Sequence, residues 1–190
     1  MIEEPIVFVD VETTGGSAFS SRILEIGAVR VENGVVVNYM NQVLDPEETV
    51  PGWITELTGI ADRETTGKPT FAAVVPQLEQ LFAGALFVAH NVTFDYSFFT
   101  EEFRRLDRSF DMPRLCTVRL SRALYPAEKS HRLDAVIARH GYEVERRHRA
   151  YDDADVLRKF YFDNLEQFGA EKFTAAHQRL RQQPKSAAFM

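Results

Sequence analysis

Hydrophobic residues along this chain first follow the two-residue period of β-strands and later the period of helices. Apolar runs at 6–11, 23–31 and 35–40 predict three strands. The Asn33-Gly34 pair between the last two runs is typical of a two-residue hairpin turn. The first run is apolar on both faces apart from one acid, which indicates a strand in the middle of a sheet. We therefore expect the chain to open with three antiparallel strands.

The rest of the chain alternates short strands with helices. Buried strands are predicted at 85–90 and 114–117. Pro76 lies inside a predicted helix and is expected to kink it. The order of elements predicts an α/β fold, in which a mixed five-stranded sheet, three antiparallel strands and then two parallel ones, is flanked by helices. The predicted helices cover residues 53–57, 71–82, the stretch from 90–95 to 106, 118–124, 132–140, 151–168 and a final polar stretch that ends near Gln183.

Length and composition bound the architecture. With 190 residues, 45% of them hydrophobic, the chain is long enough for one domain with a substantial core. We expect a single domain over residues 1–170, followed by a C-terminal helix and tail over residues 171–190. No signal-peptide pattern and no long apolar run is present, which predicts a cytoplasmic protein without a membrane partner. Cys116 is the only cysteine, which excludes an intramolecular disulfide and a thiolate-rich zinc site, and we expect it in the core.

Charge is distributed unevenly along the chain, whose net charge is −6. Residues 1–100 hold 4 Lys/Arg and 14 Asp/Glu, whereas residues 101–150 hold 12 and 8. The basic middle segment is suited to a phosphate-binding groove, and the alternative for each of its cations is a solvated place on a helix face. The candidates for such a groove are Arg104, Arg105, Arg108, Arg114, Arg119, Arg122, Lys129, Arg132, Arg146, Arg147 and Arg149.

Two acids stand at the end of the first predicted strand. Because side chains alternate along a strand, Asp10 and Glu12 leave the same face, about 6 to 7 Å apart along the backbone. A buried pair of carboxylates is costly unless a positive charge lies between its members. The pair is therefore either a solvated cap beyond the strand end or part of a divalent-cation site with oxygen ligands.

Further polar groups follow the later strands. Asp95 falls in the first turn of the helix after strand 85–90. Active residues in such sheets tend to lie at the carboxyl ends of strands and at the starts of the helices that follow, so these acids are expected to converge. A fourth acid is available at Asp152, Asp153 or Asp155, shortly after His148, which is embedded in arginines.

Three short segments carry a family resemblance. They are Asp10-Val11-Glu12-Thr13-Thr14-Gly15, His90-Asn91-Val92-Thr93-Phe94-Asp95 and His148-Arg149-Ala150-Tyr151-Asp152-Asp153-Ala154. In this order they resemble the three exonuclease motifs of the DEDDh family, and within it the DnaQ-like group of proofreading epsilon subunits of bacterial replicative DNA polymerase. The likeness runs from about Ile6 to Phe168 and leaves residues 169–190 uncovered. Tyr151 stands where family members more often carry leucine.

The resemblance implies a ribonuclease H-like fold and two Mg²⁺ or Mn²⁺ ions held by four carboxylates. By analogy, Asp10, Glu12 and Asp153 would bind the ion that carries the attacking water, and Asp10 with Asp95 would hold the second ion. His148, with an ordinary pKa of about 6.5, is suited to accept the proton of that water as general base. Contacts with the terminal nucleotide are carried over by likeness to Thr13, Thr14, Leu57 and Ile60.

The expected function is that of a metal-dependent 3′–5′ exonuclease which releases nucleoside 5′-monophosphates from single-stranded or frayed 3′ ends. DNA is favoured over RNA as the substrate, and a DNA polymerase subunit is a candidate partner. One alternative is a ribonuclease of the same fold that trims RNA. The other alternative is a non-catalytic module that docks on a polymerase, although such a module has no use for an unneutralised acid cluster.

The helical period generates a first prediction, which concerns Asp152 and Asp153. Steps of three and four residues from Asp153 lead along a mostly apolar stripe that includes Leu157 and Phe160, so Asp153 is expected to face the sheet. We predict that Asp153→Asn lowers kcat by several orders of magnitude through loss of a metal ligand, whereas Asp152→Asn lowers it less than about tenfold. Steady-state assays of the two variants, which remove the same charge, check this, and equal losses would contradict it.

Overall fold

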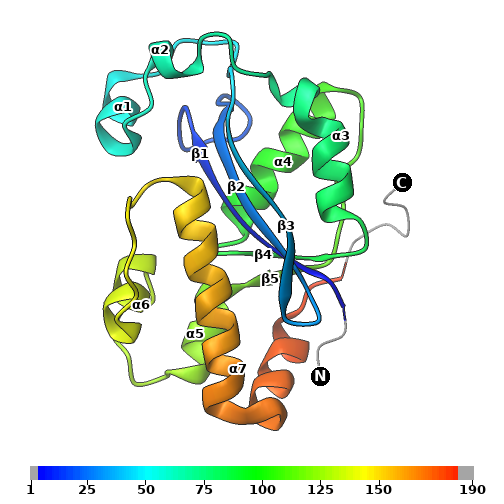
Figure 1. Cartoon of the computed structure of the whole chain (residues 1–190), viewed down its shortest axis with the longest axis vertical. Helices are drawn as coiled ribbons and strands as arrows, with labels where there is room; N and C mark the ends of the chain where they lie inside the picture. Colours follow the sequence, from blue (N-terminus) through cyan, green and yellow to red (C-terminus); the bar gives the residue numbers. More distant parts are fainter. Residues whose placement is uncertain (1–3, 184–190) are drawn as a thin grey trace.

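Five strands form one mixed sheet in the computed structural model, which describes residues 4–183 (Figure 1). They are β1 (Ile6–Thr13), β2 (Ile23–Glu32), β3 (Val35–Val43), β4 (Leu86–Ala89) and β5 (Arg114–Cys116). Their order in the sheet is β3-β2-β1-β4-β5. β2 pairs antiparallel with β1 and β3, whereas β4 pairs parallel with β1 and β5. The predicted fold class and the central place of β1 are confirmed.

Helices cover both faces of this sheet. Those within residues 4–183 are α1 (Gly52–Thr58), α2 (Asp62–Thr65), α3 (Phe71–Phe82), α4 (Thr93–Arg105), α5 (Thr117–Leu124), α6 (Leu133–His140) and α7 (Ala150–Leu180). Val7 and Val9 of β1 lie in a core cluster with residues of α3 and α4, whereas Ile6 and Phe8 lie in a second cluster with residues of α5 and α7. β1 is thus buried on both faces, which accounts for its apolar run.

The structure differs from the prediction mainly at the ends of elements. β1 and β3 continue to Thr13 and Val43, beyond their predicted ends at 11 and 40. The short helix α2 was not predicted; its first turn is capped by Glu64, whose carboxylate accepts the N–H of Ala61 at 2.9 Å. α3 has its predicted bounds, Phe71–Phe82, and includes Pro76, which is exposed; the kink at Pro76 stays a prediction.

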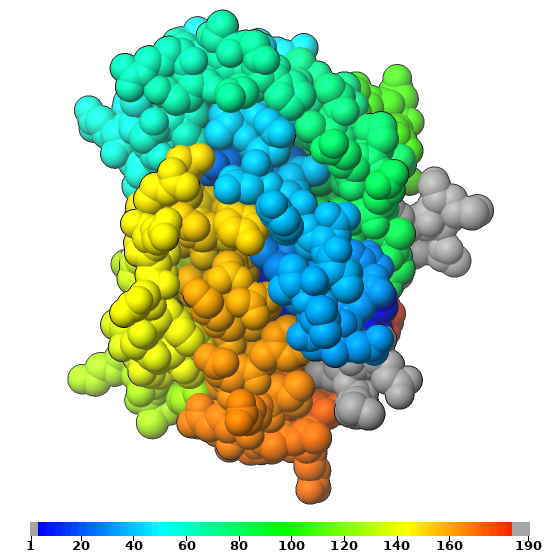
Figure 2. Space-filling model, viewed as in Figure 1, coloured from blue at the N-terminus to red at the C-terminus, as the bar shows by residue number. Residues whose placement is uncertain are grey.

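The hairpin between β2 and β3 has the turn that its sequence indicates. Asn33 and Gly34 have φ angles of 51° and 80°, the positive values that a type I′ turn requires. β3 forms one edge of the sheet and shares a face of the molecule with α7 (Figure 2). The rings of Tyr39 and Tyr151 join these two elements, with centroids 5.6 Å apart. The hairpin therefore fixes the outer side of β2, the strand that borders β1.

The last helix consists of two parts. Gly169, with φ 75° and ψ 158°, interrupts α7, as the predicted change of helix near residue 168 requires. In the second part Phe173 is fully buried, and its ring lies 4.9 Å from that of Tyr161 in the first part. The helix ends at Leu180, before the expected end near Gln183. The division at residue 170 stays a prediction, and the tail after Pro184 lies outside the described residues.

Two further expectations concern the core and the membrane. Cys116 is buried in the core beside β4, as expected. The helical spacing of Phe94 and Phe98 predicts core packing, and their rings lie 4.9 Å apart within the cluster under α4. Among residues 4–183, no helix combines the length and the apolar character needed to cross a membrane.

Candidate active site

Asp10 and Glu12 lie on the face of β1 that packs against α7. Ile6 and Phe8, earlier on the same face, belong to the core cluster beneath α7. Alternation along the strand places the two acids at the end of this apolar row. They are half-buried rather than solvated beyond the strand end, because β1 continues to Thr13. The alternative that Asp10 and Glu12 form a solvated cap beyond the strand is therefore wrong.

Asp95 reaches β1 from the first turn of α4. The pairing of β4 with β1 ends at Phe8, so the N–H of Val11 has no strand partner on that side. The Oδ1 atom of Asp95 accepts this N–H at 3.2 Å, and Asp95 is only 2% exposed. The bond ties Asp95 to the strand segment between Asp10 and Glu12, so that three acids lie together.

The fourth acid comes from the first turn of α7. Asp153 is 4% exposed and lies beside Glu12, whereas Asp152 is half-buried and its carboxylate lies 3.8 Å from the Nε atom of Arg146. The helical period thus gave the orientation of Asp153 correctly. Steps of three and four residues from Asp152 predict a largely charged outer row that includes Val156, and this part of the prediction is wrong because Val156 is buried.

Glu12, His148 and Asp153 form a group with the geometry of a metal site. Each offers one ligand atom, and these three atoms lie within 4.8 Å of one another. His148 stands on the loop before α7, with a left-handed φ of 59°. Asp10 is close enough to Glu12, Asp95 and Asp153 for each to disfavour its ionisation. The structure therefore brings all five predicted catalytic residues together.

Burial and mutual repulsion hold these acids toward their protonated forms. Burial, reinforced by Asp153, raises the pKa of Glu12 to about 8. Burial also raises the pKa of Asp95 to about 8, against the opposing effect of the Val11 N–H. The pKa of Asp10 is raised well above its ordinary value by burial and then by the neighbouring acids. A divalent cation supplies the positive charge that would let these groups ionise, so the residues present fit such an ion.

Within the described residues, Arg147 is the cation that forms an ion pair with an acid of the cluster. Its guanidinium pairs with Asp153 and, through Nη2 at 2.8 Å, with Asp134 of α6. The pKa of Asp153 is nevertheless raised, because burial outweighs this partner. Arg147 therefore forms an ion pair with one acid of the four, and its weaker effect on Asp10 and Glu12 does not offset their burial.

The loop that carries His148 is anchored to β2 by an ion pair between a buried acid and a half-buried arginine, which the sequence pattern did not predict. Glu25 is fully buried and accepts two bonds from the Nε atom of Arg149, each 3.0 Å, and one from the N–H of Ala150 at 3.0 Å. The backbone also approaches closely, because a Cβ on Gly27 would lie 2.0 Å from the carbonyl carbon of Ala150. The sequence did contain a signal for this ion pair, because Glu25 is an acid within the apolar run 23–31.

Thr13 and Thr14 shape the loop after β1. Both are buried, and the hydroxyl of Thr13 donates to the carbonyl of Gly15 at 2.8 Å. The hydroxyl of Thr14 bonds to Glu48 and accepts the N–H of Arg22 at 2.8 Å. Their polar groups are thus engaged within the protein.

The apolar residues predicted to contact a base differ in exposure. Leu57 on α1 is 48% exposed, whereas Ile60 is 2% exposed and packs in a core cluster with Leu24 and Ile54. Trp53, one turn before Leu57 on the same helix, is 58% exposed and was not predicted as a contact. Accordingly, the side chains of Trp53 and Leu57 on α1 are exposed to solvent, whereas Ile60 packs in the core against Ile54 of that helix.

The mixed sheet, with acids and a histidine gathered at one strand end, has the features of a hydrolase active site. A family model described as exonuclease (RNase_T) matches residues 7–161, and the chain belongs to this family. The family membership predicted from the three motifs is confirmed.

Named relatives include much longer proteins. The chain is 36% identical over 168 residues to the PolC-type DNA polymerase III of Clostridium perfringens, a match that covers 87% of this chain and 12% of the relative. It is 34% identical over 170 residues to the 3′-5′ exonuclease DinG of Bacillus subtilis, with 87% and 18% covered. The chain therefore spans less than a fifth of either relative.

Solved structures share the fold. Exonuclease X in complex with 5′-overhanging duplex DNA aligns with a TM-score of 0.67 and 24% identity, over 90% of this chain and 98% of that one. A 3′-exonuclease that recognises the 3′ end of a histone mRNA stem-loop aligns with a TM-score of 0.74 and 14% identity, over 87% and 65%. One architecture thus occurs in proteins described with DNA and with RNA.

The anchored loop generates a second prediction. Glu25→Gln removes the charge that holds Arg149, so the His148 loop should shift and kcat should fall by about tenfold or more, because small displacements of a reacting group are costly. The matched control is Glu32→Gln, which removes a half-exposed partner of Arg30 from the same strand. Equal kcat for the two variants would contradict the anchoring role, and restoration of kcat in Glu25→Asp would support it.

The raised pKa values generate a third prediction. Glu12 and Asp95 titrate near pH 8 when folded and near their ordinary values of about 4 when unfolded. The folded state then binds more protons between these limits, so the free energy of unfolding in EDTA should fall as pH rises from about 4.5 to 8. Mg²⁺ should raise Tm more at pH 8 than at pH 5. Glu12→Gln should reduce both the pH dependence of the free energy of unfolding and the increase of Tm by Mg²⁺. A Tm independent of Mg²⁺ at pH 8 would contradict the prediction.

Proposed function

We propose that this chain is a divalent-metal-dependent 3′–5′ exonuclease that hydrolyses the 3′-terminal phosphodiester of single-stranded or frayed DNA and releases nucleoside 5′-monophosphates. The observation that carries the proposal is the group of Glu12, His148 and Asp153, with ligand atoms within 4.8 Å of one another, beside the buried Asp95 and the half-buried Asp10. Carboxylate oxygens are the ligands that Mg²⁺ and Mn²⁺ prefer. Membership of the exonuclease family supports the same reaction.

The proposed roles follow from where the side chains lie. Asp10, Glu12 and Asp153 would hold one ion, and Asp10 with Asp95 the other. When bound, two such ions would supply the positive charge that activates a water molecule and stabilises negative charge on the leaving oxygen. His148 accepts the proton of that water. The water oxygen bonds to phosphorus as the bond to the 3′ oxygen breaks, and the 3′ oxygen takes a proton from solvent.

The terminal nucleotide is proposed to lie between the acid cluster and α1. The exposed faces of Trp53 and Leu57 are suited to pack against a base, since aromatic and apolar side chains contact bases of any sequence. Thr13 and Thr14 would border the 3′-OH through the loop that their hydroxyls fix. Ile60 contributes by supporting α1.

DNA is the proposed substrate because the relatives with more than 30% identity include a PolC-type DNA polymerase III. RNA trimming is the second candidate, favoured by the fold shared with a 3′-exonuclease of histone mRNA. The proposal also includes a cytoplasmic location and association with a DNA polymerase, by analogy with the PolC-type relative. A purely docking module is disfavoured by the complete set of acids.

A fourth prediction tests this function with matched substrates. A linear single-stranded DNA, the same sequence closed into a circle, and the RNA equivalent are incubated with Mg²⁺ or with EDTA. We expect mononucleotides from linear DNA in Mg²⁺ only, and no cleavage of the circle, because the reaction needs a 3′ end and a cation. Asp10→Asn should be inactive, whereas the exposed control Asp107→Asn should be fully active.

Cleavage of the circle or full activity in EDTA would contradict the proposed function. Faster hydrolysis of the RNA than of the DNA would favour the second candidate.

A further inference from the structure

A basic cavity lies beside the acid cluster, between the end of β4, helix α5 and the start of α6. Its volume is about 410 Å³. We call it the basic pocket; its lining residues include Asn91, Arg122, Lys129, His131, Arg132 and Leu133. No acid contributes to this lining, although the whole chain has a net charge of −6. Such a concentration of positive charge is a feature of anion-binding sites.

Three cations of the basic pocket are free to bind a ligand. Arg122, Lys129 and Arg132 are exposed, and within residues 4–183 none of their side chains forms an ion pair or a hydrogen bond. The acids next to them in the sequence already have other partners. Glu128 lies 3.5 Å from Arg139, and Asp134 lies 2.8 Å from Arg147. The charge of the pocket is therefore not neutralised from within the protein.

The wall of the basic pocket is fixed by hydrogen bonds between α5, α6 and the segment between them. Ser121 of α5 bonds to the Nδ1 atom of His131 at 2.8 Å. Arg139 of α6 donates to the carbonyl of Ser130 at 2.8 Å and to the hydroxyl of Ser121 at 3.3 Å. Ser130 and His131 are thus held in place, and the neighbouring Lys129 and Arg132 extend from a fixed backbone.

Two connections link the basic pocket to the acids. His90, on its wall, bonds through Nδ1 to Thr117 at 2.9 Å and precedes the turn that carries Asp95. On the other side, Leu133 precedes Asp134, which Arg147 joins to Asp153. In Figure 1, α1 lies above and α6 below the start of α7, the helix that carries Asp153. The elements that line the basic pocket are thus separate from α1, the helix proposed to contact the terminal base.

We propose that the basic pocket binds backbone phosphates of the substrate strand on the 5′ side of the scissile phosphodiester, through Arg122, Lys129 and Arg132. This inference rests on the proposed function and adds the path of the strand. With the terminal nucleotide between the acids and α1, the remaining strand would leave past α5 and the start of α6, where the basic pocket lies. Lysine and arginine at a fixed wall neutralise its phosphates without reading the bases.

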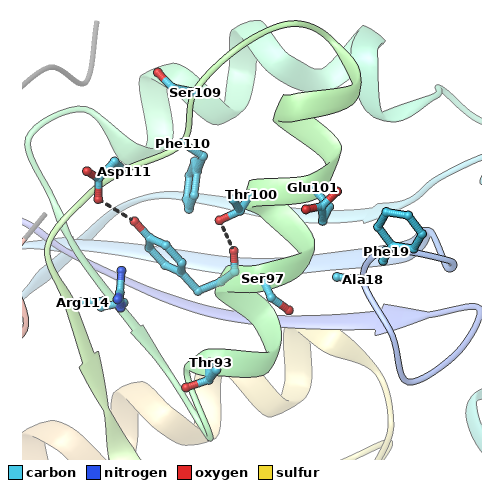
Figure 3. Close-up of a pocket in the computed structure, with 11 residues that line it drawn as sticks. Ala18, Phe19, Thr93, Ser97, Thr100, Glu101, Ser109, Phe110, Asp111 and Arg114 are labelled. Atoms are coloured by element: carbon cyan, nitrogen blue, oxygen red, sulfur yellow. Dashed lines mark hydrogen bonds between the residues drawn. The ribbon is translucent and has the colours of Figure 1, made fainter. Parts of the chain in front are cut away.

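A second cavity, of about 600 Å³, lies along α4 and does not fit this role (Figure 3). Its cation, Arg114, lies 4.2 Å from the centre of the Tyr96 ring and donates to Gln182 at 2.8 Å. Two acids, Glu101 and Asp111, line the same space. The cation is engaged and the acids would repel a phosphate, so the basic pocket is the better site.

A fifth prediction tests this path with the triple variant Arg122→Gln, Lys129→Gln, Arg132→Gln. The control removes three exposed charges outside the pocket: Lys68→Gln, Lys172→Gln, Arg179→Gln. Substrates are a 12-nucleotide oligothymidylate and the nitrophenyl ester of thymidine 5′-monophosphate, which has no upstream phosphate. The pocket variant should raise KM for the oligonucleotide about tenfold or more relative to KM for the ester, and lower the slope of log(kcat/KM) against log[salt] by about 2, since each phosphate contact on a single strand contributes roughly 0.7.

Binding of the labelled oligonucleotide in EDTA, followed by fluorescence anisotropy, makes the test independent of hydrolysis. The pocket variant should bind about tenfold more weakly than the control. Equal affinity and equal salt dependence of the two variants would overturn the inference, as would equal losses on oligonucleotide and ester. If the unchanged protein hydrolyses neither substrate, the proposed function fails, and the binding measurement still decides the role of the pocket.

Discussion

Four carboxylates crowded at one end of the central strand are the constraint on which the rest of this structure depends. Their negative charges repel one another, and burial removes much of the water that would weaken the repulsion. The fold still brings them together from β1, α4 and α7. Arg147 pairs with Asp153 alone among them. The cluster therefore requires protons or further cations, and phosphodiester hydrolysis is chemistry that divalent cations in such a site support.

The surrounding structure holds this repulsive arrangement through groups that take no direct part in the chemistry. The N–H of Val11, left open where β4 ends, fixes Asp95 against β1. Glu25 and Arg149 join β2 to the loop before α7, and Gly27 leaves room for the backbone of that loop. The close approach explains why a glycine is needed inside a strand, where it would otherwise be unfavourable. Contacts from β2 as well as from β1 thus hold the site residues in place.

Local periodicity predicted much of this arrangement, and long-range contacts account for the rest. Alternation along β1 and the helical period of α7 were enough to predict that Glu12 and Asp153 lie close together. The pairing of Glu25 with Arg149 joins residues 124 apart in the sequence, so no local pattern specifies it. The burial of Ile60 likewise depends on how α1 packs on its neighbours, because spacing alone cannot separate a base contact from a core residue.

Diffraction from crystals grown with Mn²⁺, recorded at a wavelength where Mn²⁺ scatters anomalously, tests the cation role of the cluster most directly. The predicted result is two anomalous peaks among Asp10, Glu12, Asp95 and Asp153, about 3.5 to 4 Å apart, with Arg147 displaced from Asp153. Crystals of the variant Asp153→Asn should lose the peak next to Glu12. Absence of Mn²⁺ from the four acids of the unchanged protein, with Arg147 still paired to Asp153, would contradict the account.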